Sequence, residues 1–299
     1  MILSVSRRTD IPALYSEWFL NRLDAGEVYI RNPFNSRQVT RLIIPPENID
    51  CIVFWTKDPA PLISRKHLLE SFSIPYYFLF TITPYGEDIE PNLPPVPELL
   101  TRFRNLSETL GKERVIWRYD PIIFTPDMDE NYHLRRFAEM CGTLSGHTAR
   151  CIVSFFAPYK TVLKNCEELS IQLPEADRMR GMLKNLKEIA DNYSIELRTC
   201  AAAEDYSGLG IEPSECIDSK LISRITGKTI PYKKDPSQRK ECRCTRSIDI
   251  GAYTTCTHGC LYCYANTNHK KAYEMFRRHD PLSPTLTGGV HEEDTVTRK

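Results

Sequence analysis

The pattern of apolar and polar positions divides most of the chain into alternating strands and helices. From the N-terminus to about residue 200, short apolar runs rich in β-branched and aromatic residues alternate with amphipathic segments of helical period. The expected strands are 2–6, 51–56, 77–83, 114–119, 151–156 and 195–200. Because these runs are almost continuously apolar, we expect both faces of each strand to be buried, as in a mostly parallel sheet covered by helices.

Helices are expected between the strands and after the last of them, at 13–25, 59–70, 97–110, 130–145, 174–192 and 218–227. Helix 97–110 carries a start signal at Pro97 and a stop signal at Gly111. A further strand pair, 28–31 and 38–44, flanks a turn-forming Asn-Pro-Phe-Asn segment. Repeated βα units predict an α/β fold. A complete or incomplete (β/α) barrel is the first choice, and an open doubly wound sheet is the second.

Domain boundaries follow from the change of pattern after the last expected strand. Residues 1–216 are predicted to form the barrel-like domain, 217–278 a cysteine-rich module packed on the barrel mouth, and 279–299 a flexible tail. The 39 basic and 39 acidic residues balance, and no apolar run is long enough for a membrane helix. We therefore expect a cytoplasmic protein with no membrane partner.

Candidate metal chemistry is concentrated in one window, because five of the 11 cysteines lie between Cys242 and Cys263. Cys256, Cys260 and Cys263 have the spacing C-x3-C-x2-C, which lets three thiolates converge on an iron–sulfur cluster or a zinc ion. His258 or an upstream cysteine would close such a site, whereas a small-molecule ligand in the fourth position would leave it reactive. A loop without metal is the third alternative.

The cysteine motif resembles that of the radical S-adenosylmethionine (SAM) enzymes, with Tyr262 as the aromatic residue before the third cysteine. Together with Gly259, Tyr264 and Ala265, it is similar to the spore photoproduct lyase-like branch of those enzymes. The whole chain resembles a bacterial and archaeal family, domain of unknown function 1848. This likeness rests on the cysteines and on three earlier segments, namely Ser4-Val-Ser-Arg-Arg-Thr-Asp10, Phe54-Trp-Thr-Lys57 and Trp117-Arg-Tyr-Asp120.

The radical SAM resemblance implies a cofactor and a reaction. Cys256, Cys260 and Cys263 would hold a 4Fe-4S cluster whose open iron takes SAM, with Tyr262 beside the cofactor. One-electron reduction, from a donor such as flavodoxin or ferredoxin, would then cleave SAM to a 5′-deoxyadenosyl radical that abstracts hydrogen from a substrate. Radical SAM enzymes usually carry the motif after the first barrel strand, whereas here it lies near the C-terminus.

A second group of cysteines consists of Cys242 and Cys244, with Cys200 after a predicted strand and Cys216 before a predicted helix. These four could build a second closed site, such as the auxiliary cluster of some radical SAM enzymes. In the alternative interpretation, Cys200 and Cys216 are small buried apolar residues, and Cys244 could instead complete the first cluster.

Charged residues follow the predicted strands, at the end where a barrel places its catalytic face. They include Arg8, Asp10, Lys57, Arg118, Asp120 and Glu204. Arg8 and Arg118 would suit a carboxylate or phosphate, and Asp120 or Glu204 could hold ribose hydroxyls or move protons. Alternatively, Arg8 with Asp10 and Arg118 with Asp120 form ion pairs that close the mouth of the barrel.

A basic segment, 220–246, contains nine basic and two acidic residues, which would suit nucleic-acid phosphates or a solvated surface. Three functions are therefore open. The first is a radical SAM-like enzyme acting on a small-molecule or nucleic-acid substrate. The second is a nucleic-acid-binding protein with a closed zinc or iron–sulfur site. The third is a barrel hydrolase that uses Asp120 and Glu204 and carries a structural metal.

Overall fold

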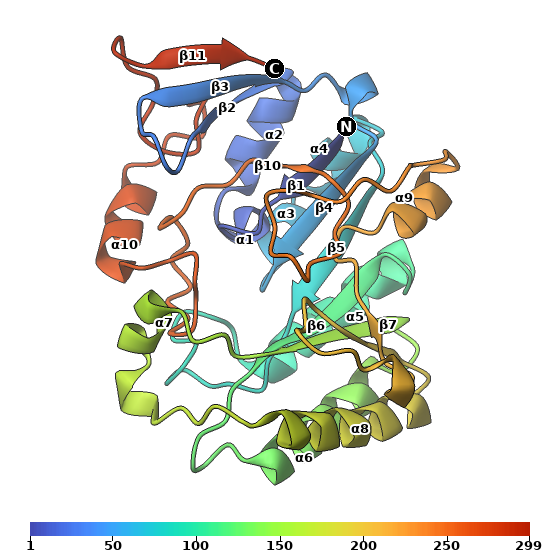
Figure 1. Cartoon of the computed structure of the whole chain (residues 1–299). Helices are drawn as coiled ribbons and strands as arrows, with labels where there is room; N and C mark the ends of the chain where they lie inside the picture. The colour runs from blue at the N-terminus through green and yellow to red at the C-terminus, as the bar shows by residue number, and fades with distance from the viewer.

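The computed structural model describes residues 1–299, except for the side chain of Thr161. An eight-stranded sheet dominates it, and every strand pair in this sheet is parallel (Figure 1). The six strands expected from the sequence are confirmed, with small shifts at their ends. In chain order the sheet contains β1 (Ile2–Val5), β4 (Cys51–Thr56), β5 (Tyr76–Thr81), β6 (Val115–Ile122), β7 (Arg150–Phe155), β8 (Glu196–Thr199), β9 (Glu212–Pro213) and β10 (Ile248–Asp249).

The spatial order of the strands is β10-β1-β4-β5-β6-β7-β8-β9. Six of them, β1 and β4 to β8, therefore lie in chain order, without the reversal that defines a doubly wound sheet. The two edge strands, β10 and β9, do not pair with each other in the described part of the chain, so the expectation of a complete barrel is corrected to an open sheet. Both edge strands contain only two residues, too few to close the sheet.

A second, three-stranded sheet holds the C-terminal segment. β2 (Glu27–Arg31) and β3 (Gln38–Ile43) form the expected antiparallel pair, and β11 (Thr295–Arg298) adds to β3 in parallel. Thus residues 279–299, expected as a flexible tail, contain a paired strand. The β-branched run at β11 completes the open edge of β3, and Arg31 forms an ion pair with Asp294 at 2.6 Å.

Helices occupy the connections between strands. They are α1 (Ile11–Leu14), α2 (Ser16–Asp24), α3 (Ala60–Ile63), α4 (Lys66–Ser71), α5 (Val96–Leu110), α6 (Glu130–Leu144), α7 (Lys160–Asn165), α8 (Ala176–Asn192), α9 (Ser219–Thr226) and α10 (His269–Arg277), with short 3-10 turns at Pro46–Asn48, Glu167–Leu169 and Ser207–Leu209. All six expected helices are present, although the first two are each split in two. Within the described residues, we find no helix with the length and apolar character required to cross a bilayer.

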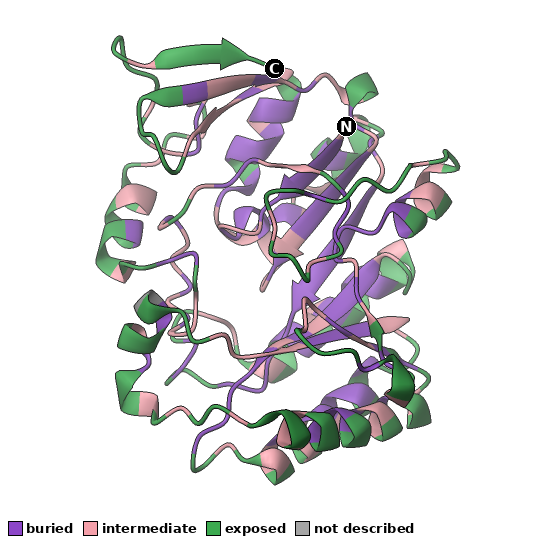
Figure 2. Ribbon diagram, viewed as in Figure 1, coloured by how far each residue is buried: buried purple, intermediate pink, exposed green. Residues whose placement is uncertain are grey.

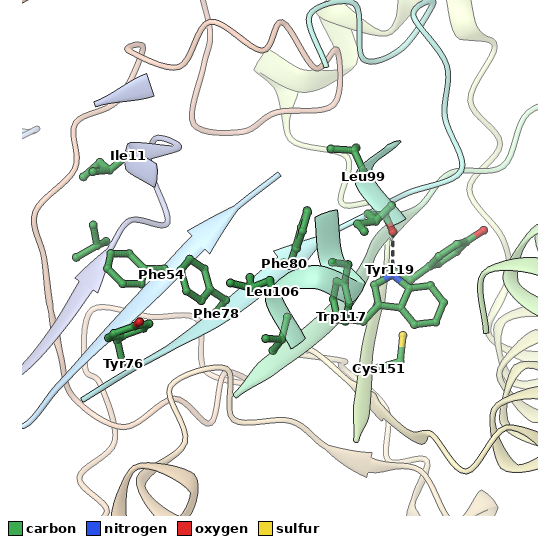
Figure 3. Close-up of a cluster of buried hydrophobic side chains, with 14 of the residues drawn as sticks. Ile11, Phe54, Tyr76, Phe78, Phe80, Leu99, Leu106, Trp117, Tyr119 and Cys151 are labelled. Carbon is green, nitrogen blue, oxygen red and sulfur yellow. Dashed lines mark hydrogen bonds between the residues drawn. The ribbon is translucent and has the colours of Figure 1, made fainter. Parts of the chain in front are cut away.

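One face of the sheet packs against the helices that connect the strands, and we call it the helix-covered face. Figure 3 shows how Phe54, Phe78, Phe80 and Trp117 lie along it, one strand after another. The same core cluster includes Trp18, Phe103, Phe137 and Leu186 from α2, α5, α6 and α8. The main strands of the large sheet are mostly buried, whereas the outer surfaces of helices such as α8 are exposed (Figure 2).

The other face of the sheet, which we call the inner face, changes character along the strands. Val53, Ile116 and Ile152 belong to a second apolar cluster that is covered by Leu221 and Ile222 of α9. Side chains two residues further along a strand share its face, so the next inner-face positions are Trp55, Arg118 and Ser154. The inner face is therefore apolar at the start of the strands and polar at their carboxyl ends.

We expect the substitution Phe78→Ala to lower the free energy of unfolding by about 3 to 5 kcal/mol, because it removes a large buried ring. Phe78 is 0% exposed, and its ring stacks on Phe54 with 4.9 Å between centroids. Phe34→Ala is the matched control, since Phe34 is 95% exposed and its loss should change stability by less than about 0.5 kcal/mol. Denaturant titration measures both, and equal effects would contradict this account of the core.

Candidate functional site

A cavity of about 590 Å³ lies at the carboxyl ends of the parallel strands. Its wall includes every charged residue that the sequence singled out, Arg8, Asp10, Lys57, Arg118, Asp120 and Glu204. It also includes Tyr262 and all seven of the predicted cysteine ligands. Carboxyl ends of parallel strands meet at one edge of a sheet, so residues far apart in the chain become neighbours there. The chemical roles assigned to them remain predictions.

The cysteine loop, residues 256–263, follows β10 and is fastened to the chain on both sides. Nδ2 of Asn92 donates to the carbonyl oxygen of Thr257 at 2.8 Å. The main-chain nitrogen of Asn92 donates to the carbonyl oxygen of His258 at 3.2 Å. Asn266 donates through Nδ2 to the carbonyl oxygen of Cys256 at 2.7 Å. These bonds replace the regular pairing that an irregular loop lacks and fix its path along the cavity wall.

Gly259 allows the tightest part of the cysteine loop to pass close to a neighbouring segment. Its φ angle is +76°, in the left-handed region that side chains disfavour. An added Cβ atom would lie 2.9 Å from Cγ of Pro91 and 3.1 Å from Nδ2 of Asn92. Both the backbone conformation and the available space therefore require glycine between the first two cysteines.

Of the three thiols of this loop, that of Cys260 is buried, and those of Cys256 and Cys263 are half-buried. Burial raises the pKa of Cys256 to about 12 and raises the pKa values of Cys260 and Cys263 as well, so the free thiols stay protonated at neutral pH. Within the described residues, no group of three or more His, Cys, Asp or Glu side chains has the arrangement needed to hold a metal ion. Metal binding at these thiols would therefore require loss of their protons and adjustment of their side chains.

Asp10 connects three parts of the site, and its side chain is only 6% exposed. One oxygen accepts from the main-chain nitrogen of Ala13 at 3.0 Å and caps α1. The other accepts from the main-chain nitrogen of Lys57 at 2.7 Å and lies 2.9 Å from Nε2 of His258. Asp10 thus holds β1, β4 and the cysteine loop together. His258, which the sequence offered as a fourth metal ligand, has its Nε2 beside Asp10.

Glu90 is a functional candidate that sequence reasoning missed, because it lies in an irregular loop with no motif. Its Oε1 accepts from Thr83 Oγ1 at 2.6 Å, pairs with Lys57 Nζ at 2.8 Å, and accepts a hydrogen bond from the hydroxyl of Tyr262. Burial opposes the charge of Lys57, but Glu90 and the sulfur of Cys260 outweigh it, so the pKa of Lys57 is raised. A permanent cation therefore lies beside the cysteine loop.

The ring of Trp55, in the wall of the cavity, lies against two arginines. The guanidinium carbons of Arg7 and Arg118 lie 5.2 and 4.9 Å from the centroid of its ring. Arg118 also pairs with Asp120, which accepts a hydrogen bond from the hydroxyl of Ser154. The pairing of Arg118 with Asp120 that the sequence left open is thus present. Trp55, which the sequence places in a strand and in the segment Phe54-Trp-Thr-Lys57, also contributes to the site.

The remaining predicted charges are less tightly held. Arg8 donates through Nη1 to the carbonyl oxygen of Gly251 at 3.4 Å and lies over the ring of Tyr253, with 5.1 Å to its centroid. Among the described residues Arg8 does not form the ion pair with Asp10 that the sequence left open, and Asp10 lies beside His258 instead. Glu204 lines the cavity from an exposed loop after β8.

All nine basic residues of 220–246 are exposed, and Arg239 also lines the cavity.

The second group of cysteines is brought together from three separate segments. Sγ of Cys200, just after β8, lies 3.8 Å from Sγ of Cys216, just before α9. The thiols of Cys216 and Cys242 next to Cys244 lower the pKa of Cys244 to about 2. The sequence could name these four residues as a set, but only the fold makes them neighbours.

Comparison with known proteins identifies one match. A protein-family model described as domain of unknown function (DUF1848) matches residues 2–265. No curated protein and no solved structure matches the chain. The matched range contains both groups of cysteines and ends before α10 and β11.

We expect Gly259→Ala to disturb the cysteine loop more than Gly26→Ala disturbs its own turn. Both glycines have positive φ angles, +76° and +66°, so each substitution should cost about 1 to 2 kcal/mol in backbone strain. Only Gly259 also meets neighbouring atoms, whereas an added Cβ at Gly26 has nothing within 4 Å. Hydrogen exchange should therefore rise in residues 254–266 for Gly259→Ala alone. Similar exchange in both variants would refute the close-contact argument.

Proposed function

The chain belongs to the DUF1848 family, and we propose that it is a radical SAM-type iron–sulfur enzyme whose cavity receives the cluster, SAM and the substrate. The observation that carries this proposal is the position of the cysteine loop. Cys256, Cys260 and Cys263 line the same cavity as the charged carboxyl ends of the parallel strands. Three closely spaced thiolates and an adjoining polar cavity are what a cluster with one substrate-accessible iron requires.

The place of the loop in the sheet supports the same proposal. The motif lies late in the chain, but the strand before it, β10, pairs with β1 through Leu3 and Ser4 (Figure 1). In spatial order β10 therefore comes first, ahead of six strands that follow one another in chain order. A cysteine loop after the first strand of an incomplete (β/α) barrel is the arrangement that the radical SAM resemblance implies.

The donor set and its surroundings fit a 4Fe-4S cluster. Three thiolates supply soft ligands, and the raised pKa of Lys57 keeps a cation beside Cys260 to offset their negative charge. Gly259 keeps the loop tight, and the hydrogen bond of Tyr262 to Glu90 holds the aromatic residue of the motif in place. When bound, such a cluster would supply the electron that converts SAM into a 5′-deoxyadenosyl radical able to abstract hydrogen.

The chain itself would bind and orient the ligands. Arg8, at the cavity wall with only a long hydrogen bond to Gly251, has guanidinium donors suited to a carboxylate or phosphate. Arg118 is held over Trp55 and paired with Asp120, so it would offer its remaining N–H groups in a fixed direction. Glu204 would accept from hydroxyl groups of a ligand at the cavity wall.

The reductant would be an external protein such as flavodoxin or ferredoxin, and the setting would be the cytoplasm. All eleven cysteines are free in the structure, including the adjacent pair Cys200 and Cys216, which fits a reducing compartment.

A nucleic-acid-binding protein with a closed metal site is the second candidate. The observation that favours it is the exposure of all nine basic side chains of 220–246, one of which, Arg239, reaches the cavity. Under this alternative, binding to nucleic acid would weaken steeply with salt and would not need SAM. The hydrolase alternative has less support, because Asp120 is already engaged by Arg118 and Ser154.

We expect Cys260→Ala to remove both the iron and the reductive cleavage of SAM, because the cluster would lose one of its three ligands. Cys141→Ala is the matched control, since Cys141 is also buried but lies in α6 within the helix-covered core. The protein should be purified without oxygen. Iron, sulfide, 5′-deoxyadenosine formed with dithionite, and the electron paramagnetic resonance signal with and without SAM are then measured.

Wild type and Cys141→Ala should bind about four iron atoms per chain and show a signal that shifts on addition of SAM. Cys260→Ala should do neither, while circular dichroism shows that it is folded. SAM cleavage by the Cys260→Ala variant would refute the proposal. A wild-type cluster that is indifferent to SAM would favour the closed-site alternative.

A further inference from the structure

Four cysteines outside the cysteine loop come together at the wall of the same cavity. Cys200 directly follows β8, and Cys216 precedes α9. Cys242 and Cys244 lie in the connection between α9 and β10. The sulfur atoms form a series of contacts, because Cys216 lies against Cys200 and Cys244, and Cys244 lies against Cys242. Four thiols gathered at one place are the ligand set of a closed metal site.

The distance between the sulfur atoms of Cys200 and Cys216 distinguishes between kinds of metal site. Zn–S bonds of about 2.3 Å in a tetrahedron place neighbouring sulfur atoms about 3.8 Å apart. The sulfur atoms of Cys200 and Cys216 are 3.8 Å apart. A 4Fe-4S cluster binds each cysteine to a different iron and so holds the sulfur atoms much farther apart. The spacing therefore matches two thiolates on one ion.

The surroundings of these four cysteines suit a negatively charged centre. The main-chain nitrogen of Ile217 donates to Sγ of Cys244 at 3.4 Å, and Arg7 lies close enough for its charge to interact with Cys244. Arg118 lies close enough for its charge to interact with Cys200 and Cys216. Arg7 and Arg118 each keep a buried side-chain nitrogen without a hydrogen-bond partner among the described residues.

The backbone around Cys216 is fixed by the sheet. The hydroxyl of Tyr77, on the inner face of β5, donates to the carbonyl oxygen of Cys216 at 2.7 Å and accepts from the main-chain nitrogen of Asp218 at 3.2 Å. Asp218 in turn caps α9. A ligand held by Cys216 is therefore attached to a rigid part of the fold, as metal sites require.

We propose that Cys200, Cys216, Cys242 and Cys244 bind one zinc ion as a closed tetrathiolate site. Zinc with four thiolates carries a net negative charge, and Arg7 and Arg118 are the cations that offset it. Binding would release the remaining thiol protons to solvent and would involve no redox step. With four protein ligands the ion has no open position, so it is structural and ties β8, α9 and the basic segment to the cavity wall.

As the side chains stand, the sulfur atoms are arranged as successive pairs, and they are not yet placed around one centre. Closing the site requires rotation about the Cα–Cβ bonds of cysteine, which interchanges staggered conformations of similar energy. This inference does not depend on the radical SAM proposal, because zinc at these residues is measured separately from iron at the cysteine loop.

The test is metal analysis of the full-length protein purified without oxygen, in three forms. We expect about one zinc ion per chain in the wild type and in the Cys256→Ser/Cys260→Ser/Cys263→Ser variant. The Cys216→Ser/Cys244→Ser variant should lose the zinc. Because that variant is at risk of misfolding, X-ray absorption at the zinc edge of the wild type provides a second measurement. It should show four sulfur neighbours at about 2.3 Å.

Three results would overturn the proposal. The first is zinc that persists in Cys216→Ser/Cys244→Ser and disappears when the cysteine loop is changed. The second is nitrogen or oxygen among the zinc neighbours of the wild type. The third is the absence of zinc from the wild-type protein, with an iron content of either about four or about eight atoms per chain. The last value would assign a second cluster to these cysteines. The first result would also contradict the cluster proposed at the cysteine loop, whereas the other two results leave that proposal intact.

Discussion

Burial of both faces of a parallel sheet is the constraint on which the rest of this structure depends. Successive side chains of a strand point to opposite faces, so each strand must supply two apolar sets at once. In β5, Tyr76, Phe78 and Phe80 face the helices, while Tyr77 and Leu79 face α9. Along each strand, the apolar residues of the inner face stop before those of the helix-covered face. Beyond that point, the inner face has room for polar groups, and the cavity lies there.

The buried charges of Lys57, Arg118 and Asp10 in that cavity are tolerated because each has a partner. Lys57 pairs with Glu90, Arg118 pairs with Asp120, and Asp10 accepts from main-chain donors and lies beside His258. An unpaired buried charge would cost several kcal/mol, so these contacts are a condition of folding as well as of function. The same contacts connect strands to the cysteine loop. Fold and site are therefore stabilised by one network.

The two groups of cysteines face one cavity from different segments and have different surroundings. Around the cysteine loop, fixed glycine geometry and three donors suit a cluster with an open position. Around Cys216 and Cys244, four cysteine ligands, a main-chain N–H that donates a hydrogen bond to sulfur, and two arginines suit a closed site. If both proposals hold, the closed site positions the cavity wall on which a substrate of the first site would lie. Reactive and structural metal chemistry would then be separated by ligand number alone.

The sequence by itself determined the local elements and the residue types of the site. Apolar periodicity predicted the six main strands, the hairpin and the six helices. The spacing of Cys256, Cys260 and Cys263 predicted a common ligand. These features depend on neighbours within a few residues, which a sequence displays directly.

Contacts between distant segments were decided only by the tertiary structure. The pairing of β10 with β1, the addition of β11 to β3, and the approach of Glu90 to Lys57 join residues with no shared local pattern. β10 has only two residues and β11 has only one apolar residue, so neither has a periodic signal, and their pairing follows from open sheet edges. In the same way, the packing of α9 on the inner face of the sheet makes Cys200 and Cys216 neighbours of Cys244. Composition and spacing fix which groups a chain contains, and packing fixes which of them meet.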